Sequence, residues 1–377
     1  LLEASVSRPP MQLEQYDPRV VALTPHSQNF FETLGLWSSI AEKRACPYRN
    51  MTVWDAEGTG HIEFSAEQVQ QSRLGHIVEN KIVLASLFDA IEQDTNITLL
   101  QSARVKHVLS VEPNQNSSLV SEKSSVVLES GETLSAHLLI AADGAKSQVR
   151  SLVNIPTREW SYKQKAIVCT VHTELAHEFT AYQRFLSTGP LAFLPLLAQG
   201  DADTQTLSSI VWSCDEAFAD ELMGLNDEAF CDELGKAFEH RLGKICRIEK
   251  RFCIPLQQRH AVSYFKPGVV LIGDAAHSIH PLAGQGVNLG LLDCEVLSSE
   301  ILRAVDKNIP LSHESILRRY QRQRKGNNLG MMALMESFKR LFGSDELAVR
   351  WLRNEGMGRL DGVPAIKNTI IRQAMGL

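Results

Sequence analysis

The sequence lacks several features that would assign it to a structural class at once. It has no run of about 18 uncharged apolar residues, so we expect no membrane-spanning helix. Its seven cysteines are scattered and form no CxxC pair, which argues against a disulfide framework or a zinc site and favours a reduced, cytoplasmic location. Positive charge is in deficit as well, because a net charge of -6 is the opposite of what nucleic-acid binding requires.

What the chain does contain is ordinary for a globular protein. Its composition, with 44% hydrophobic and 22% charged residues, is typical of globular domains. Its length of 377 residues is sufficient for two domains with a buried core. The charge is unevenly spread, since residues 301–377 hold 14 Lys and Arg against 7 Asp and Glu. Such a basic segment suits contact with an anionic membrane or an acidic partner, and a solvated helical face gives the same count.

The hydrophobic patterning predicts a mixture of helices and strands. Helices are expected at residues 25–38, 82–91, 218–241, 287–304 and 312–342. Strands are expected at 51–55, 61–64, 97–100, 103–109, 166–172, 180–186, 191–197 and 207–213, and a hairpin with a glycine turn is expected at 126–134. Two continuous apolar runs, 138–142 and 269–272, are typical of strands that are buried on both faces. This order predicts an α/β domain with an antiparallel-sheet domain inserted into it.

The first segment that carries chemistry is 273–290, directly after one of the buried runs. A strand ending in Gly273-Asp274 brings backbone close to a ligand and offers one carboxylate to a hydroxyl group. The loop from Pro281 to Gly286 can expose backbone N–H groups, and a helix that begins near Gly286 points its positive dipole end at the same place. The segment therefore suits an anionic or hydroxylated ligand.

The second segment is 138–150, in which a buried strand leads to Asp143-Gly144, followed by Ser147 and Arg150. Taken alone, Asp-Gly after a strand is usually a turn. Because it occurs together with segment 273–290, a ligand-binding role for Asp143-Gly144 is better supported than it would be alone.

Together the two segments resemble the class A flavin-dependent aromatic monooxygenases of the para-hydroxybenzoate hydroxylase type. The stretches 75–80, 317–324 and 371–376 further resemble the aerobic ubiquinone-biosynthesis hydroxylases, and the ring-C5 hydroxylase is the most similar subtype. The resemblance covers nearly the whole chain. It implies a Rossmann-like FAD-binding domain, an inserted antiparallel-sheet substrate domain and a helical C-terminus. The implied FAD-binding domain is 1–48, 76–158 and 262–330, the substrate domain is 49–75 and 159–261, and the helical segment is 331–377.

One part of that family pattern is not found. The first βαβ unit of these enzymes carries a G-x-G-x-x-G loop that binds the pyrophosphate, and no such loop follows a strand here. Leu1-Leu2-Glu3 resembles the end of the second strand of that unit, with Glu3 as the acidic residue for the adenosine ribose. We therefore expect an N-terminally truncated or partly ordered form with weak FAD affinity and no activity, in which about thirty residues of the pattern are absent.

The resemblance also implies a set of cofactor-binding residues. They are Glu3, Arg19, Asn80, Asp143, Gly144, Gly273, Asp274, Pro281, Gly284, Gln285, Gly286, Val287 and Asn288. Two have plain alternatives, a surface salt bridge for Arg19 and a helix N-cap for Asn80. His277 and His280 are interpreted as structural, so no catalytic side chain and no metal site are predicted.

The implied reaction is the hydroxylation of a polyprenylated phenol. NADH or NADPH would reduce FAD, O2 would form a flavin hydroperoxide, and the electron-rich ring would take up the distal oxygen. Val168, Phe185, Phe193, Pro195, Ile210 and Trp212 are expected either to roof the flavin or to be plain core. Segment 331–377 is expected to contact the membrane surface or other ubiquinone-biosynthesis proteins, with core packing or a homo-oligomer contact as alternatives. A soluble aromatic substrate or a non-catalytic scaffold role are the remaining hypotheses.

Overall fold

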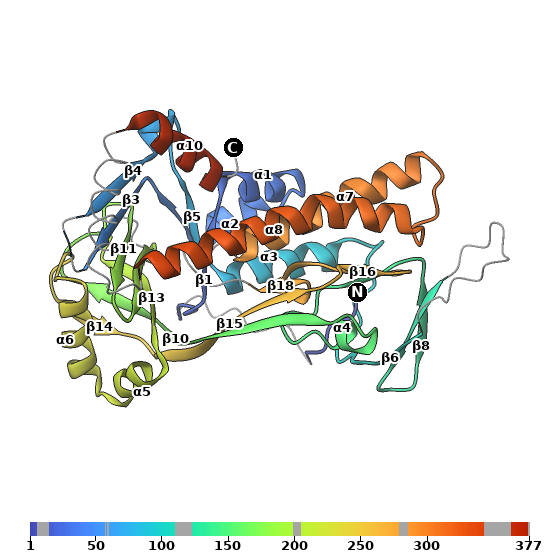
Figure 1. The fold of residues 1–377 in the computed structure, drawn as a ribbon, viewed down its shortest axis with the longest axis horizontal. Helices are drawn as coiled ribbons and strands as arrows, with labels where there is room; N and C mark the ends of the chain where they lie inside the picture. The colour runs from blue at the N-terminus through green and yellow to red at the C-terminus, as the bar shows by residue number, and fades with distance from the viewer. Residues whose placement is uncertain are drawn as a thin grey trace.

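The fold is described from a computed structural model, shown in Figure 1. The residues described are 1–5, 15–56, 58, 60–109, 123–198, 205–278, 286–342 and 363–375. Over these residues the chain has the predicted mixed α/β architecture, with one large sheet, three small sheets and long helices towards the C-terminus.

The large sheet forms the body of the inserted domain. Its strand order is β18 (His277–Ser278), β15 (Phe252–Ala261), β10 (Thr157–Thr173), β13 (Leu207–Asp215), β12 (Gly189–Pro195), β11 (Thr180–Leu186), β3 (Asn50–Asp55) and β4 (His61–Ser65), and β14 (Ile245–Ile248) also pairs with β10. The predicted antiparallel sheet is confirmed except at one junction, where β3 and β11 run parallel. This junction brings segment 50–65 to the sheet, as the predicted division of the chain requires.

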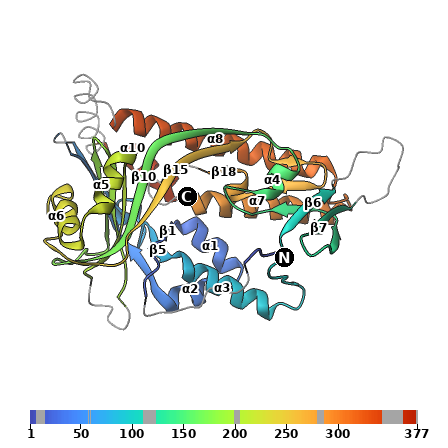
Figure 2. The same ribbon diagram turned by 90° about the horizontal axis from the view of Figure 1, so that it is seen from below.

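Two helices cover the outer face of this sheet, α5 (Glu216–Gly224) and α6 (Asp227–Ala237) (Figure 2). The prediction of a single helix over 218–241 is wrong. The side chain of Asn226 caps α6 by accepting a hydrogen bond from the Ala229 N–H at 2.8 Å, so a new helix begins there.

A second sheet is built from β16 (Phe265–Lys266), β17 (Val269–Leu271) and β9 (Leu139–Ala141), in which β9 and β17 are parallel. All three residues of β17 are fully buried, as predicted. The same prediction is wrong for β9, since Ile140 is 43% exposed and only one face of that strand is covered. The cover comes from α4 (Gln148–Leu152), α7 (Gly286–Asp306) and α8 (Glu314–Phe342), the last two side by side in Figure 1.

A third sheet consists of β1 (Val20–Leu23), β5 (Gly75–Glu79) and β2 (Ala45–Tyr48). It packs against α1 (Pro25–Thr33), α2 (Trp37–Arg44) and α3 (Asn80–Gln93). The Thr24 side chain caps α1 just before Pro25, which confirms the predicted start. The predicted helix over 25–38 is divided, because Gly35 has a φ of 70° and breaks it.

The N-terminal residues lie beside a small sheet of β6 (Val105–Leu109), β7 (Ser124–Leu128) and β8 (Thr133–Ala136). Leu2 pairs with Leu100 in parallel, and the Glu3 N–H donates to the Leu100 carbonyl at 2.9 Å. The extended conformation expected for Leu1-Leu2-Glu3 is thus present. The predicted strand over 97–100 is reduced to this single bridge.

The C-terminal helix α10 (Pro364–Met375) packs on the inserted domain beside η1 (Ala66–Val69). Its Ile371 and Met375 are buried against Ala66, Val69 and Leu74. The α10 part of segment 331–377 therefore contributes to a hydrophobic core, as the core-packing alternative predicted. The predicted domain boundaries are a separate matter and remain a prediction.

No helix in the part of the chain that the structure describes has the length and apolar character needed to cross a membrane.

Candidate functional site

The two motif segments begin at the ends of neighbouring parallel strands. Ala141 of β9 lies opposite Leu271 of β17, and the Ile272 N–H donates to the Ala141 carbonyl at 3.0 Å. The carboxyl ends of parallel strands meet at one edge of a sheet, and open α/β sheets bind their ligands there. The structure thus brings Asp143-Gly144 and Gly273-Asp274 together.

Arg150 joins these two segments from a buried position. Its guanidinium donates from Nη1 to the Ala275 carbonyl at 2.8 Å and from Nη2 to the Ala145 carbonyl at 2.9 Å. Ser147 caps α4 by accepting from the Arg150 N–H, and Asp143 accepts from the Val149 N–H at 3.0 Å. Burial, with a smaller contribution from Arg259, lowers the pKa of Arg150. The second motif is therefore a capped turn whose arginine anchors the first motif.

Asp274 has the environment of a ligand-binding carboxylate. It lies in the short 3-10 turn η2 (Gly273–Ala275), where Gly273 adopts a left-handed φ of 56°. The Asp274 side chain is exposed and makes no hydrogen bond to any described residue, yet surrounding protein raises its pKa through desolvation. A solvent-accessible carboxylate that is partly desolvated by its surroundings is suited to accept a hydrogen bond from a hydroxyl group of a bound molecule.

The N-terminus of α7 provides a second open surface. A Cβ placed on Gly286 would meet no atom within 4 Å, and Val287 is 37% exposed. Asn288 is instead buried, with its amide donating to the Ala22 carbonyl at 2.7 Å and accepting from Ser27 Oγ at 2.7 Å. Asn288 therefore holds the helix end in place, while positions 286 and 287 can face a ligand. Pro281, Gly284 and Gln285, with His280, lie outside the described residues.

The three remaining predicted residues are on other elements. Glu3 follows the bridge to Leu100, and its carboxylate accepts from the Ser5 N–H at 2.8 Å. Arg19 is 64% exposed and its Nε lies 3.7 Å from Asp17, which is the salt bridge named as its alternative. Asn80 is the first residue of α3, and the cap position belongs to Glu79, so the N-cap alternative for Asn80 is wrong.

Sequence reasoning missed the carboxylate at the centre of this region, Asp293. It is fully buried in α7 and accepts from the Gly273 N–H at 2.9 Å, from His277 Nε2 at 2.6 Å and from Arg324 Nε at 2.7 Å. Burial opposes its ionisation, but the hydrogen bonds from His277 and Arg324 hold its pKa below the ordinary value. An acidic residue within an otherwise apolar stretch of a predicted helix was the signal available. The structural interpretation of His277 fits this contact.

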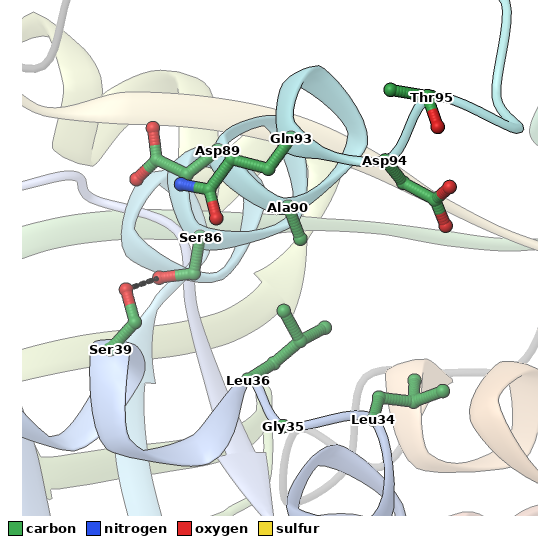
Figure 3. Close-up of a pocket in the computed structure, with 10 residues that line it drawn as sticks. All are labelled: Leu34, Gly35, Leu36, Ser39, Ser86, Asp89, Ala90, Gln93, Asp94 and Thr95. Carbon is green, nitrogen blue, oxygen red and sulfur yellow. Dashed lines mark hydrogen bonds between the residues drawn. The ribbon is translucent and has the colours of Figure 1, made fainter.

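A cavity of about 580 Å³ lies elsewhere, where the corner between α1 and α2 faces α3 (Figure 3). Its wall includes Leu36, Ser39, Ser86, Asp89 and Gln93. None of the predicted cofactor residues lines it, so we do not assign it to the site.

The comparison with known families shows to which family the chain belongs. The model of the FAD binding domain family matches residues 11–331. The chain belongs to this FAD binding domain family.

Curated relatives of this FAD-binding chain are hydroxylases. The 3-demethoxyubiquinol 3-hydroxylase of Escherichia coli K12 is 33% identical over 96% of the chain and 88% of its own length. The mitochondrial ubiquinone biosynthesis monooxygenase COQ6 of Danio rerio is 34% identical over 95% of the chain and 79% of its length. The predicted identity as an FAD-dependent monooxygenase of the ubiquinone-biosynthesis hydroxylase family is confirmed.

Solved structures confirm the predicted fold. The p-nitrophenol 4-monooxygenase PnpA of Pseudomonas putida superimposes with a TM-score of 0.74 at 16% identity, covering 99% of this chain and 91% of that one. Klebsiella pneumoniae HpxO, solved with FAD and uric acid, gives 0.71 at 16% identity, covering 99% and 90%. At such identity the match shows the fold alone.

The residues of this FAD-binding chain fit the cofactor. Asp274 offers a carboxylate, and a side chain at Gly286 would meet no atom of the described residues within 4 Å. Their neighbours Gly273 and Asn288 are tied to Asp293 and Ala22 through hydrogen bonds. Among the described residues no group of His, Cys, Asp or Glu could hold a metal ion.

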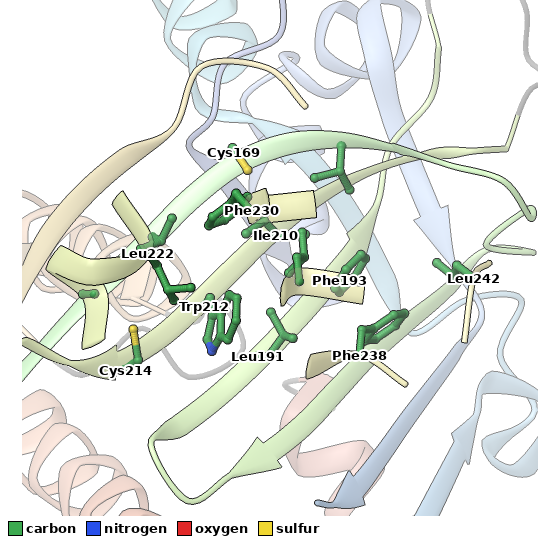
Figure 4. Packing of buried hydrophobic residues seen from close by; sticks show 14 of the residues in the cluster. Cys169, Leu191, Phe193, Ile210, Trp212, Cys214, Leu222, Phe230, Phe238 and Leu242 are labelled. Carbon is green, nitrogen blue, oxygen red and sulfur yellow. The ribbon is translucent and has the colours of Figure 1, made fainter. Parts of the chain in front are cut away.

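In this FAD-binding chain the large sheet has an outer face, covered by α5 and α6, and an inner face. Of the residues predicted either to roof the flavin or to be plain core, those on the outer face are plain core. Phe193, Ile210 and Trp212 pack on the outer face against α5 and α6 (Figure 4). The strand alternation turns their neighbours inward, where Ala192 and Leu194 pack against β1 and β5. The inner-face cluster consists of Ala22, Ile77, Ala181, Ala192, Leu194, Leu196 and Leu207. Only Val168 and Phe185 of the predicted roof share the inward face.

Proposed function

We propose that this flavoenzyme hydroxylates the ring of a polyprenylated phenol in ubiquinone biosynthesis, using NADH or NADPH and O2. The observation that carries the proposal is identity above 30% along at least 95% of the chain with two enzymes whose names place them in that pathway. Such coverage includes both the cofactor segments and the inserted sheet.

FAD, when bound, supplies the activation of O2 that amino-acid side chains cannot provide. In our proposal Gly273 and Asp274 bind the ribityl chain, with Arg19 and Asn80 near the flavin. Glu3 takes the adenosine ribose, and Asp143-Gly144 contributes to both FAD and NAD(P)H binding. The segment Pro281, Gly284, Gln285, Gly286, Val287 and Asn288 forms the wall at the α7 N-terminus, whose helix dipole favours negative charge on the reduced cofactor.

We place the substrate ring against the inner face of the large sheet. This face is mainly aliphatic, which excludes water and suits a prenylated ring. Gln183 is a buried polar residue on this face, as are Ser209 and Thr170. It lies opposite Ala192, and its side chain makes no hydrogen bond to any described residue. Gln183 is thus our candidate for hydrogen bonding to an oxygen substituent of the ring.

The experiment is reconstitution of the chain with FAD, followed by NADH and NADPH oxidation and product analysis. Two substrates are compared, a polyprenylated phenol and the same ring without its tail. Coupled hydroxylation of the prenylated ring supports the proposal. Turnover of the short phenol alone favours the soluble aromatic substrate, and an FAD-loaded chain that oxidises neither NADH nor NADPH favours a scaffold role.

We also propose a peripheral location at the inner face of the membrane, with segment 331–377 and partner proteins of the pathway involved. Its excess of Lys and Arg supports contact with anionic lipid. Flotation of the full chain with anionic vesicles, but not with neutral ones, is the expected result, and equal flotation would reject this location. A homo-oligomer is tested by light scattering on the same sample.

A further inference from the structure

Asp293 connects the η2 turn with helix α7, the two elements to which we assign FAD, and its own carboxylate is turned into the protein interior. One carboxylate oxygen, Oδ2, accepts the Gly273 N–H at 2.9 Å and His277 Nε2 at 2.6 Å. The other, Oδ1, accepts Arg324 Nε at 2.7 Å. Asp293 and its partners His277 and Arg324 are all at most 2% exposed. The carboxylate is therefore satisfied by protein and cannot itself reach a ligand.

The approach of α7 to the turn explains why Asp293 can reach Gly273. Gly290 lies three residues earlier, on the same side of the helix, and a Cβ on Gly290 would be 3.4 Å from the Gly273 Cα. Two glycines thus allow the helix and the η2 turn to pack backbone against backbone. The hydrogen bond from the Gly273 N–H then fixes that turn, in which Gly273 has a φ of 56° and Asp274 follows.

The same helix carries the second half of the site at its N-terminus. Gly286 and Val287 are two turns before Asp293, and Asn288 ties that end to Ala22 and Ser27. Arg324 fixes the other side, because its Nη2 atom also donates to the Leu289 carbonyl at 3.2 Å. Any displacement of Asp293 therefore changes the distance between Asp274 and the start of α7.

We propose that Asp293 is a positioning residue for FAD, acting through Gly273 to hold the Asp274 turn at a set distance from the α7 N-terminus. This inference rests on the assignment of FAD to the site above. Its chemical requirement is a carboxylate, since two oxygens must accept four donors, the fourth being the Asn328 amide at 3.5 Å from Oδ1. An asparagine can accept with only one of its two terminal atoms.

The chain offers a matched control on the same helix. Glu300 is also a buried carboxylate of α7 that binds an arginine of α8, with Oε2 3.1 Å from Arg319 Nε. Glu300 makes no contact with the η2 turn in the described part of the chain. Glu300→Gln thus reproduces the loss of a helix–helix ion pair and leaves the cofactor turn unchanged.

The experiment measures the FAD dissociation constant of the 377-residue chain by flavin fluorescence quenching, with the absorbance spectrum of the bound flavin as a second readout. We expect Asp293→Asn to weaken FAD binding about tenfold or more and to shift the flavin spectrum, because a charged acceptor is lost behind the turn. Glu300→Gln is expected to bind FAD as the parent does. Equal affinity and equal spectra for both variants would overturn the inference.

A second pair of variants is needed in case Asp293→Asn misfolds because Arg324 is left buried without its carboxylate. Asp293→Asn with Arg324→Gln leaves no unpaired buried guanidinium, and its control is Glu300→Gln with Arg319→Gln. The same difference in FAD affinity is expected between these two neutral pairs, and no difference would again overturn the inference. If the parent chain itself fails to bind FAD, the proposed function fails instead, so the two outcomes are distinguishable.

Discussion

The side chain of Arg150 donates a hydrogen bond to the backbone carbonyl of Ala275 at 2.8 Å, across 125 residues of sequence. The bond joins the turn after β9 to the turn after β17, the two places where ligand-binding residues were predicted. Because Arg150 is buried and binds both the Ala275 and the Ala145 carbonyls, its guanidinium ties the two turns together.

Replacing that guanidinium should be costly. We expect Arg150→Met to lower the free energy of unfolding by about 1–3 kcal/mol, because the buried Ala275 carbonyl loses its charged donor, while the Ala145 carbonyl keeps Arg259 Nη1 as a donor. Urea denaturation measures the change. The control is Arg318→Met, which removes an exposed pair with Glu314 and should cost about 0.5 kcal/mol or less. Equal losses for the two variants would show that Arg150 is not an anchor.

We expect the ionised Asp274 side chain to destabilise the folded chain and to contribute to FAD binding. Desolvation raises its pKa in the folded chain, so the folded state binds more protons than the unfolded state above pH 3.8. Its contribution to stability therefore falls as the pH rises through the folded pKa, and ionised Asp274 destabilises the chain at neutral pH. We expect Asp274→Asn to raise the melting temperature without FAD and to weaken FAD binding.

The matched control for Asp274 is Asp306→Asn at the exposed end of α7, which should change neither quantity. A melting temperature that falls in Asp274→Asn would contradict the sign of this argument. Unchanged FAD affinity would remove Asp274 from the cofactor site.

The amide of Asn288 should matter for stability as much as for the cofactor. It donates to the Ala22 carbonyl and accepts from the Ser27 hydroxyl and the Thr24 N–H, so Asn288→Ala removes one donor and one acceptor from the interior. We expect a loss of about 2–3 kcal/mol in chemical denaturation. Asn29→Ala, at an exposed position of α1, should be neutral or slightly stabilising, since alanine favours helix. A loss below about 0.5 kcal/mol for Asn288→Ala would refute the anchoring role.

The sequence predicted the cofactor segments better than it predicted the substrate sheet, for a physical reason. Gly273, Asp274 and Gly286 are local: the turn, the carboxylate and the helix start lie along one short stretch, where residue type alone indicates the conformation. The direction of a strand side chain depends instead on register. Phe193 and Trp212 looked suited to a roof, but α5 and α6 bury them on the outer face.

Hydrogen bonds between residues far apart in the chain could not be predicted from the sequence either. The acceptor role of Asp293 arises because α7 crosses the η2 turn closely enough for contact with Gly273. The start of a new helix at Asn226 could have been predicted, because asparagine is a common N-cap residue. The exposure of Ile140 could not, because it depends on which elements cover β9.

The two faces of the large sheet should separate stability from substrate binding. Phe193 stacks on Phe238 with ring centroids 3.7 Å apart, so Phe193→Leu should cost about 1–2 kcal/mol in urea and leave the KM for the phenol unchanged. Gln183→Met should raise that KM several-fold with little effect on stability. The reverse pattern, in which Phe193→Leu changes KM and Gln183→Met does not, would place the substrate on the other face.

The last prediction concerns acid stability and rests on His76. This histidine of β5 is buried beside Trp37, with ring centroids 4.7 Å apart, and desolvation, helped by Arg73, lowers its pKa to about 4. Between pH 6.5 and 4 the unfolded chain therefore binds a proton that the folded chain does not. Stability should fall as the pH drops through this window, by up to about 3 kcal/mol from this one group.

His76→Phe keeps a ring against Trp37 and removes that titration. Its free energy of unfolding should decline less steeply between pH 6.5 and 4 than that of the parent, while the exposed variant His61→Gln should follow the parent. The measurement is urea denaturation at half-unit pH steps. Parallel curves for His76→Phe and the parent would show that His76 is protonated as easily in the folded chain as in the unfolded one, and that its burial does not control acid stability.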